Sequence, residues 1–309
     1  MIDTDGNRVN AHGGGVLLHE GTYYWYGEVK KGNTSRVPGS SWENYRVPAG
    51  GVSCYSSKDL INWNYEGLVL RPETTDMLHD LHSSKVIERP KVIYNTATGK
   101  FVMWMHIDLQ DYSFARSGVA ISDSPAGPFV YLRSVQPNGN QARDMTLFVA
   151  EDGNAYHFYT SEENATIHVC RLTDDYLSHT KDTKRLLPGQ FREAPAVFQH
   201  GKNFYLISSG CTGWTPNKTT YAMADTIMGD WLQFGSPCAG PNADLTFNSQ
   251  GSYIFPFNGE DFQYVFMADR WNMTDLENSG YLWLPLKITA TGVPVISWKQ
   301  DWNPNPSTL

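Results

Sequence analysis

Five segments of the chain share one hydrophobic pattern: an apolar run, a polar turn that contains glycine, and a second apolar run rich in aromatic residues. Strand-length runs on both sides of a short turn are typical of a β-hairpin. Helical periodicity is weak along the whole chain. The five predicted hairpins span residues 14–27, 88–105, 144–160, 193–208 and 251–267.

A third apolar run follows each hairpin, in residues 51–57, 117–123, 166–172, 219–225 and 280–286. Polar turns then lead to a fourth, outer strand, as in residues 56–67, 122–132 and 224–234, and the last unit continues through residues 287–298. Four strands in each of five units predict an all-β fold, a five-bladed β-propeller, with residues 1–309 in a single domain. A β-sandwich is the alternative, but it would not explain five similar hairpin units.

The composition fits many short strands and argues against two classes of function. The chain has 27 Gly, 17 Pro, 17 Tyr and 10 Trp, and only 18% charged residues, which suits strands joined by turns. A net charge of −8 argues against nucleic-acid binding, which needs clustered Lys and Arg. No run of 18 apolar residues occurs, so we expect no membrane span. The four cysteines are widely spaced, which leaves free thiols and disulfides equally open.

One polar residue stands at the head of each predicted first strand, 8 to 11 residues before the glycine of the following turn. The turn glycines are Gly21, Gly99, Gly153, Gly201 and Gly259, and the polar residues are His12, Glu88, Asp144, Glu193 and Gln250. Because the first strand of a propeller blade lines the central channel, we expect these five side chains to form a ring around one mouth of it. The alternative is that they only solvate the strand ends.

Carboxylates crowded into such a ring suit the hydrolysis of glycosidic bonds. This reaction needs a proton donor with a raised pKa and a second group that activates water or attacks directly. Asp144 and Glu193 lead adjacent blades, so an ionised Asp144 could keep Glu193 protonated. No Ser-His-Asp or P-loop signature competes, no spacing of ligands indicates a metal site, and we expect no cofactor. Aromatic residues expected in loops near the ring could stack on sugar rings, although single exposed aromatics are also ordinary: Trp42, Tyr112, Trp214 and Trp271.

Short motifs that follow one another along nearly the whole chain reinforce this interpretation. They run from DTDGNRVNAHGGG through YYWYGE, GVSCYSSKDLINW, VIERPKVIYN, VMWMH, ARDMTLF, FREAPAV, TGWTPN, NSQGSYI and ADRWN to YLWLPL. In this series the sequence resembles glycoside hydrolase family 43, and within it the exo-β-1,3-galactanase branch. The resemblance implies an inverting galactan 1,3-β-galactosidase that releases galactose from the β-1,3-galactan of arabinogalactan-type glycans. We expect a monomer, and a secreted or periplasmic protein whose leader has been trimmed, because the chain starts almost at the first motif.

The resemblance also implies roles for three residues of the ring. Glu193 of FREAP matches the general acid, and Asp144 of ARDMT matches the residue that sets the pKa of that acid. Most of the wider family has an Asp at the head of the first blade as general base, but residues 11–15 read AHGGG and lack a carboxylate. In the galactanase branch a Gln on the last blade is thought to replace this base, and Gln250 of NSQGS matches it. Whether Gln250 accepts a proton as its imidic acid tautomer, or only orients the water, stays open.

Further residues are expected to bind the sugar. Glu28 and Glu88 match carboxylates that accept hydrogen bonds from galactose hydroxyls, and Glu88 suits the axial 4-hydroxyl. The other expected substrate-binding residues are Tyr112, Asn164, Thr212, His12, Arg270 and Trp271. Two alternative functions are an α-L-arabinofuranosidase or β-xylosidase of the same family, against which the missing Asp argues, and a non-catalytic glycan-binding propeller.

Overall fold

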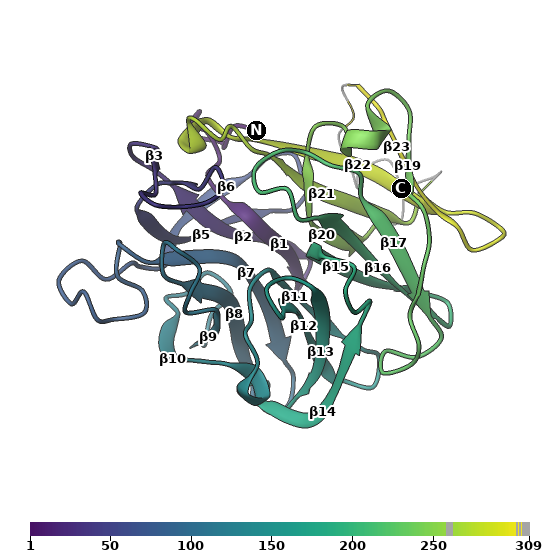
Figure 1. Ribbon diagram of the computed structural model, residues 1–309, viewed down its shortest axis with the longest axis horizontal. Coiled ribbons are helices and arrows are strands. Elements are labelled where there is room, and N and C mark those ends of the chain that lie inside the picture. The colour runs from purple at the N-terminus through teal and green to yellow at the C-terminus, as the bar shows by residue number, and fades with distance from the viewer. Residues whose placement is uncertain (258–261, 301, 303, 305–309) are drawn as a thin grey trace.

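The strands form five sheets that surround a common axis, as expected for a five-bladed β-propeller (Figure 1). The computed structural model describes residues 1–257, 262–300, 302 and 304, so the turn glycine Gly259 lies outside the described residues. The innermost strands are β1, β7, β11, β15 and β20, and in the first four blades the innermost strand also comes first in the chain. The prediction of an all-β propeller is therefore confirmed.

The first three blades each contain four antiparallel strands. Blade 1 contains β1 (His12–His19), β2 (Thr22–Lys30), β5 (Ala49–Ser57) and β6 (Asn64–Leu70). Blade 2 contains β7 (Val86–Asn95), β8 (Lys100–Asp108), β9 (Arg116–Ser122) and β10 (Val130–Val135). Blade 3 contains β11 (Met145–Val149), β12 (Ala155–Ser161), β13 (Thr166–Leu172) and β14 (His179–Leu186).

The last two blades differ at their outer edges. Blade 4 contains β15 (Arg192–His200), β16 (Asn203–Gly210), β17 (Thr220–Ala224) and a short β18 (Leu232–Gln233). Blade 5 contains β20 (Gln250–Pro256), β21 (Tyr264–Arg270), β22 (Gly280–Ile288) and β23 (Pro294–Ser297), and β19 (Cys238–Ala239) adds a parallel strand beside β23. Outside the blades lie the small sheet of β3 (Ser35–Arg36) and β4 (Tyr45–Arg46) and three 3₁₀ turns, η1 (Pro137–Gly139), η2 (Ala243–Leu245) and η3 (Leu276–Asn278).

The hydrophobic core is divided among the contacts between neighbouring blades. Five clusters of buried side chains join blades 1 and 2, 2 and 3, 3 and 4, 4 and 5, and 5 and 1. The last of them packs Trp25 of β2 against Trp283 of β22, with ring centroids 5.0 Å apart, which closes the ring of blades. Because both faces of each blade are buried, the strands read as apolar runs rather than as strict alternations.

The structure bears on two further features of the sequence, its apolar segments and its four cysteines. None of the described helices is long and apolar enough to span a membrane. All four cysteines lie within the described residues and are unpaired, Cys54 and Cys170 in the interior and Cys211 on an exposed loop. Of the two possibilities that the sequence left open, the structure therefore has free thiols.

A shared backbone irregularity turns three of the inner strands at their heads. The residue that follows the predicted ring residue has a left-handed backbone in β1 (Gly13, φ 58°), β7 (Arg89, φ 55°) and β15 (Ala194, φ 51°). Each of these strands loses its pairing register at that point. A left-handed conformation is disfavoured for residues other than glycine, so Arg89 and Ala194 must be held in place by their surroundings.

Candidate active site

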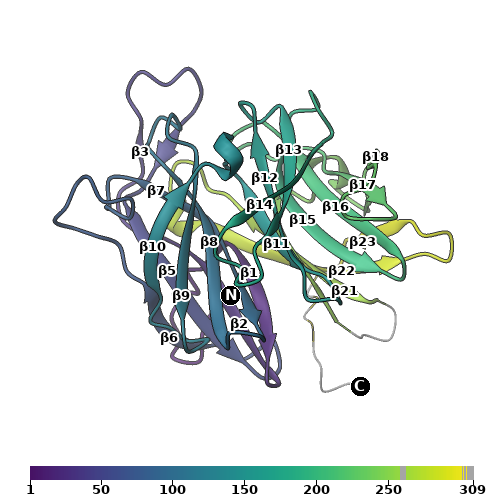
Figure 2. The ribbon, with the colours of Figure 1, turned by 90° about the horizontal axis from the view of Figure 1, so that it is seen from below.

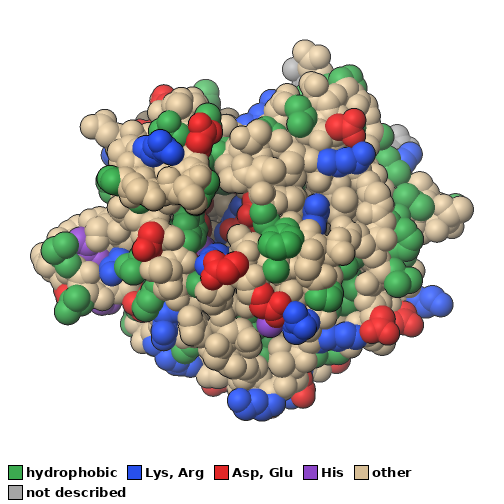
Figure 3. All heavy atoms as spheres, in the orientation of Figure 1, with side chains coloured by type: hydrophobic (Ala, Val, Ile, Leu, Met, Phe, Trp, Pro, Cys, Tyr) green, Lys and Arg blue, Asp and Glu red, His purple; other side chains and the backbone are tan. Residues whose placement is uncertain are grey.

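A cavity of about 870 Å³ opens where the inner strands begin, and four of the five predicted ring residues line it: Glu88, Asp144, Glu193 and Gln250. Figure 3 shows the hollow on this face of the molecule, with acidic and basic side chains inside it. Its volume lies in the upper part of the range for small-molecule sites, which is about 300–1,000 Å³. The convergence that the sequence predicted therefore occurs for blades 2 to 5.

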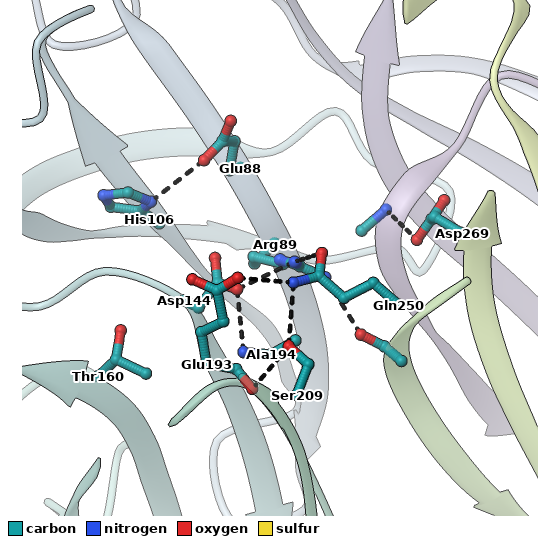
Figure 4. Close-up of polar contacts among 12 residues, drawn as sticks. Glu88, Arg89, His106, Asp144, Thr160, Glu193, Ala194, Ser209, Gln250 and Asp269 are labelled. Atoms are coloured by element: carbon teal, nitrogen blue, oxygen red, sulfur yellow. Dashed lines mark hydrogen bonds and ion pairs between the residues drawn. The ribbon is translucent and has the colours of Figure 1, made fainter. Parts of the chain in front are cut away.

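Glu193 and Asp144 form the acidic centre of this cavity. Burial, together with the smaller effect of the charge of Asp144, raises the pKa of Glu193 to about 8. Asp144 Oδ2 accepts a hydrogen bond from the backbone N–H of Ala194 (3.0 Å) and forms an ion pair with Arg89 Nη2 (2.9 Å) (Figure 4). These two contacts hold the Asp144 carboxylate beside Glu193. The pair thus combines a carboxylic acid that stays protonated near neutral pH with a fixed negative charge beside it.

Gln250 is hydrogen-bonded at both ends of its side-chain amide. Its Oε1 accepts from Arg89 Nη2 (2.7 Å) and from Trp271 Nε1 (3.0 Å), and both partners can only donate. Its Nε2 donates to Glu193 Oε1 (3.0 Å) and to Ser209 Oγ (3.1 Å). An imidic acid form would place a proton on Oε1 between two donors. These four hydrogen bonds therefore favour the ordinary amide form of Gln250 and direct its Nε2 toward Glu193.

Glu88 is surrounded by cations and one phenol. Lys30 Nζ lies 3.6 Å and Arg46 Nη1 3.5 Å from its Oε1, and Tyr112 Oη donates to its carboxylate at 3.1 Å. Burial alone would raise the pKa of Glu88, but the charges of Arg46 and Lys30 outweigh it and hold the pKa below its usual range. An ionised Glu88 is a strong acceptor for a sugar hydroxyl.

His106, on β8, lies beside the same carboxylate. His106 Nδ1 lies 3.5 Å from Glu88 Oε2, and its Nε2 lies 2.8 Å from Asp108. Burial lowers the pKa of His106, but the hydrogen bonds to Asp108 and Glu88 more than offset this effect and raise it to about 9. The imidazole is therefore cationic at neutral pH and adds a third positive charge beside Glu88.

The first blade brings a carboxylate from its second strand rather than from its first. Glu28 of β2 lines the cavity, and its Oε2 lies 3.0 Å from Lys30 Nζ. Burial raises the pKa of Glu28 to about 7, against the charge of Lys30. A Cβ added at Gly13, on β1, would lie 3.0 Å from Glu28 Oε1 and 3.3 Å from Arg89 Cδ. Gly13 therefore leaves the space that Glu28 and Arg89 fill.

Two residues that we expected at the sugar do not line the cavity, and their side chains are engaged elsewhere. His12 is buried behind the wall, where its Nδ1 contacts Asp269 Oδ1 at 2.9 Å and its ring stacks on Tyr281. The strand loses its pairing register between His12 and Gly15. Arg270 Nη2 donates to the carbonyl of Phe247 at 3.2 Å.

The remaining predicted binding residues do line the cavity: Glu28, Glu88, Tyr112, Asn164, Thr212 and Trp271. Asn164 follows two other left-handed residues in the β12–β13 turn, and its Oδ1 accepts from Thr160 Oγ1 (3.0 Å), which leaves its Nδ2 as a donor toward a ligand. Sequence reasoning missed several lining residues, among them Arg89, His106, Arg143 and Cys211. Arg89 directly follows a predicted ring residue, but strand alternation would place it on the opposite face, and only the bulge turns it inward.

Glu88, His106 and Asp144 bring one potential metal-ligand atom each to within 4.8 Å of one another. Their negative charge is compensated by side chains, because Lys30 and Arg46 lie beside Glu88, and Arg89 beside Asp144. This group does not need a metal ion for charge balance. The described residues therefore fit the binding of sugar hydroxyls better than the binding of a cation.

An axial cavity that holds a carboxyl group with a raised pKa beside an ion-paired carboxylate suits the hydrolysis of glycosidic bonds, the reaction of a glycoside hydrolase. The sequence profile of glycosyl hydrolases family 43 matches residues 16–256, and the chain belongs to this family. This establishes the resemblance seen in the motifs. The comparison with curated proteins gives no match.

Several solved structures resemble the whole chain closely. A β-1,3-galactosidase of the same family, solved with galactodeoxynojirimycin, is 41% identical, with a TM-score of 0.89 and coverage of 98% of both chains. The exo-β-1,3-galactanase of Phanerochaete chrysosporium, solved with galactose, is 34% identical (TM-score 0.84), with 96% of this chain and 64% of that one covered. An exo-β-1,3-galactanase from Clostridium thermocellum is 37% identical (TM-score 0.84), with 96% and 63% covered. The chain spans less than two thirds of the length of these last two proteins.

Proposed function

We propose that the protein is an exo-acting galactan 1,3-β-galactosidase, which releases galactose from the ends of β-1,3-galactan in arabinogalactan-type glycans with inversion at the anomeric carbon. The observation that carries the proposal is the direct association of Glu193, Asp144, Arg89 and Gln250 at the cavity floor, with no carboxylate at the head of β1. The similar structures that are called β-1,3-galactosidases and exo-β-1,3-galactanases support the choice of substrate. Such polymers occur outside cells, so we also propose a secreted or periplasmic protein.

In the proposed reaction, Glu193 donates its proton to the glycosidic oxygen as the bond to the anomeric carbon breaks. The charge of Asp144 raises the pKa of Glu193 and stabilises the positive charge that develops on the sugar. Glu88 accepts a hydrogen bond from the axial 4-hydroxyl. A site built to bind one hydroxyl strongly rejects a sugar that cannot offer it, which is how Glu88 would select galactose.

The attacking water is oriented by Gln250. After its oxygen bonds to the anomeric carbon, its surplus proton passes to bulk water, from which Glu193 regains the proton that it donated. Inverting enzymes keep about 6.5–9.5 Å between the acid and the group that handles water, whereas Gln250 Nε2 lies 3.0 Å from Glu193 Oε1. Bound substrate must therefore separate these two side chains. Arg89, Trp271 and Ser209 hold Gln250 in place, so we expect Glu193 to rotate and to leave one Nε2–H free for the water.

The test is the configuration of the first product. Hydrolysis of β-1,3-galactobiose followed by proton NMR should show α-galactose appearing before mutarotation, and release of β-galactose first would exclude the inverting assignment. A panel of aryl α-L-arabinofuranosides, β-xylosides and β-galactosides gives the second readout. Turnover of the galactoside alone is expected, because the 4-hydroxyl of galactose is axial and that of xylose is not.

The pH dependence of the reaction follows from the raised pKa of Glu193. The acid must be protonated to act, so kcat/KM should fall as the pH rises through about 8, near the pKa of Glu193 in the free enzyme. Replacing Asp144 by Asn removes a charge that raises this pKa, so the alkaline limb should move to lower pH. The measurement is kcat/KM on β-1,3-galactobiose between about pH 5 and about pH 10, which brackets the expected limb. An unchanged limb in Asp144→Asn would contradict the assignment.

A further inference from the structure

Residues 31–48, which we call the blade-1 arch, leave the first blade and project beyond the ends of its strands (Figure 2). The blade does not need them, because β2 and β5 pair directly on either side of the arch, with Lys30 opposite Ala49. The arch has its own small sheet, in which Ser35 pairs with Arg46 and Arg36 with Tyr45. An ordered excursion of this length is more often functional than incidental.

The arch is fixed to two other blades. The backbone N–H of Leu276, at the start of η3 in blade 5, donates to Thr34 Oγ1 at 2.8 Å. On the opposite side, the buried Asn44 donates through Nδ2 to the carbonyl of Gln110, in the loop that follows β8 of blade 2, at 2.8 Å. These anchors hold the arch across the rim of the cavity.

Trp42, at the tip of the arch, reaches a third blade. Its indole lines the cavity, and its ring centroid lies 6.0 Å from that of Tyr112. A Cβ added at Gly213, in the loop after β16 of blade 4, would lie only 3.1 Å from Trp42 Cε3. Segments about 170 residues apart in the chain are therefore in contact, and the indole forms part of the cavity wall between blades 2 and 4.

The contacts of Arg46, at the base of the arch, indicate where this wall would lie relative to a bound sugar. Its guanidinium lies 4.4 Å from the centre of the Tyr112 ring, and its Nη1 lies 3.5 Å from Glu88 Oε1. Glu88 is the carboxylate expected at the 4-hydroxyl. In galactose, carbon 4 lies across the ring from the anomeric carbon, and carbon 3 is next to carbon 4. A substituent on O3 of the bound sugar would therefore extend toward Arg46, Tyr112 and Trp42.

We propose that the blade-1 arch determines exo action: Trp42 and Arg46 close the cavity on the O3 side of the bound galactose, so only an unsubstituted chain end can enter. The inference rests on the proposed function and deepens it. An internal residue of a β-1,3-galactan carries a further galactose on O3, and this galactose would occupy the same space as the Trp42 indole. The remaining chain leaves from the anomeric side, away from the arch.

The experiment removes the part of the cavity wall that Trp42 forms and leaves Arg46 unchanged. In one variant, residues 37–44 are replaced by Asn-Gly, a two-residue turn that suits the paired ends Arg36 and Tyr45. A second variant, Trp42→Ala, removes only the indole. The control is Leu78→Ala, at an 88% exposed position in a loop away from the cavity lining. The substrates are linear β-1,3-galactan, β-1,3-galactotriose, and the same trisaccharide methylated on O3 of its non-reducing end.

The unaltered protein and Leu78→Ala should release galactose as the only product of the polymer and leave the methylated trisaccharide intact. The two arch variants should cleave the methylated trisaccharide, and at least the turn replacement should form oligosaccharides of two or more units from the polymer. If both variants cleave galactotriose but spare its methylated form, the proposal is wrong. If the turn-replacement variant does not fold, cleavage of the methylated trisaccharide by Trp42→Ala tests the proposal alone: cleavage supports it and no cleavage contradicts it. If the unaltered protein does not cleave galactotriose at all, the proposed function itself fails.

Discussion

Glu193→Gln should lower kcat on β-1,3-galactobiose by about 10²- to 10⁴-fold, the usual contribution of general acid catalysis. The substitution keeps the size of the side chain and its place beside Gln250, but an amide cannot deliver a proton to the departing oxygen. KM should change far less than kcat, because Glu193 acts on the leaving oxygen rather than on the hydroxyls of the bound sugar. The measurement is steady-state release of galactose at about pH 6, which is about two units below the pKa of Glu193.

A substrate that does not need protonation makes this test specific. With 2,4-dinitrophenyl β-galactoside the leaving group departs as a stable anion, so Glu193→Gln should retain most of its activity. The matched control is Glu151→Gln, in the exposed turn after β11, which should behave like the unaltered protein on both substrates. An equal loss of kcat on both galactosides would mean that Glu193 is not the acid.

Much of the architecture was predictable because a propeller repeats one unit. Five hairpins of similar pattern required five blades, and the spacing of Asp144 and Glu193 from their turn glycines placed both at the heads of inner strands. Neither deduction needed the details of packing, since the blades are antiparallel sheets whose order follows the chain. For the same reason four of the five predicted ring residues reach the cavity.

The misplaced and missed residues lie where the backbone departs from regular strands. His12 and Arg89 sit beside bulges with left-handed residues, and the sequence pattern of alternating sides does not reveal such bulges. The first bulge withdraws His12 toward Asp269, and the second turns Arg89 inward between Asp144 and Gln250. The role of Arg89, in β7, therefore depends on how this strand is placed relative to β11 and β20, at whose starts Asp144 and Gln250 lie.

Other contributions to the site depend on contacts between segments far apart in the chain. His106 and Lys30 lie on second strands, where they read as ordinary polar positions, yet both lie beside Glu88. Trp42 was noted only as an aromatic residue in a loop. Its contact with the Gly213 loop depends on how the arch folds across the rim, and no local pattern encodes this path.

Gln250→Ala should lower kcat on β-1,3-galactobiose by about 10²-fold or more, the scale of effect that misplacement of a reacting group produces. Alanine removes the amide that orients the water, and it also leaves Arg89 Nη2 and Trp271 Nε1 without their shared acceptor. The control Gln233→Ala, on the exposed edge strand β18, should leave turnover unchanged. Near-normal turnover of Gln250→Ala would remove Gln250 from the mechanism.

The leaving group separates this variant from the acid variant. Water must be oriented whichever group departs, so Gln250→Ala should be slow on 2,4-dinitrophenyl β-galactoside as well as on galactobiose, whereas Glu193→Gln should be slow only on galactobiose. Rescue of Gln250→Ala by the better leaving group would show that Gln250 assists departure through Glu193, to which its Nε2 is hydrogen-bonded. A persistent defect places the amide on the side of the incoming water, opposite the acid, as inversion requires.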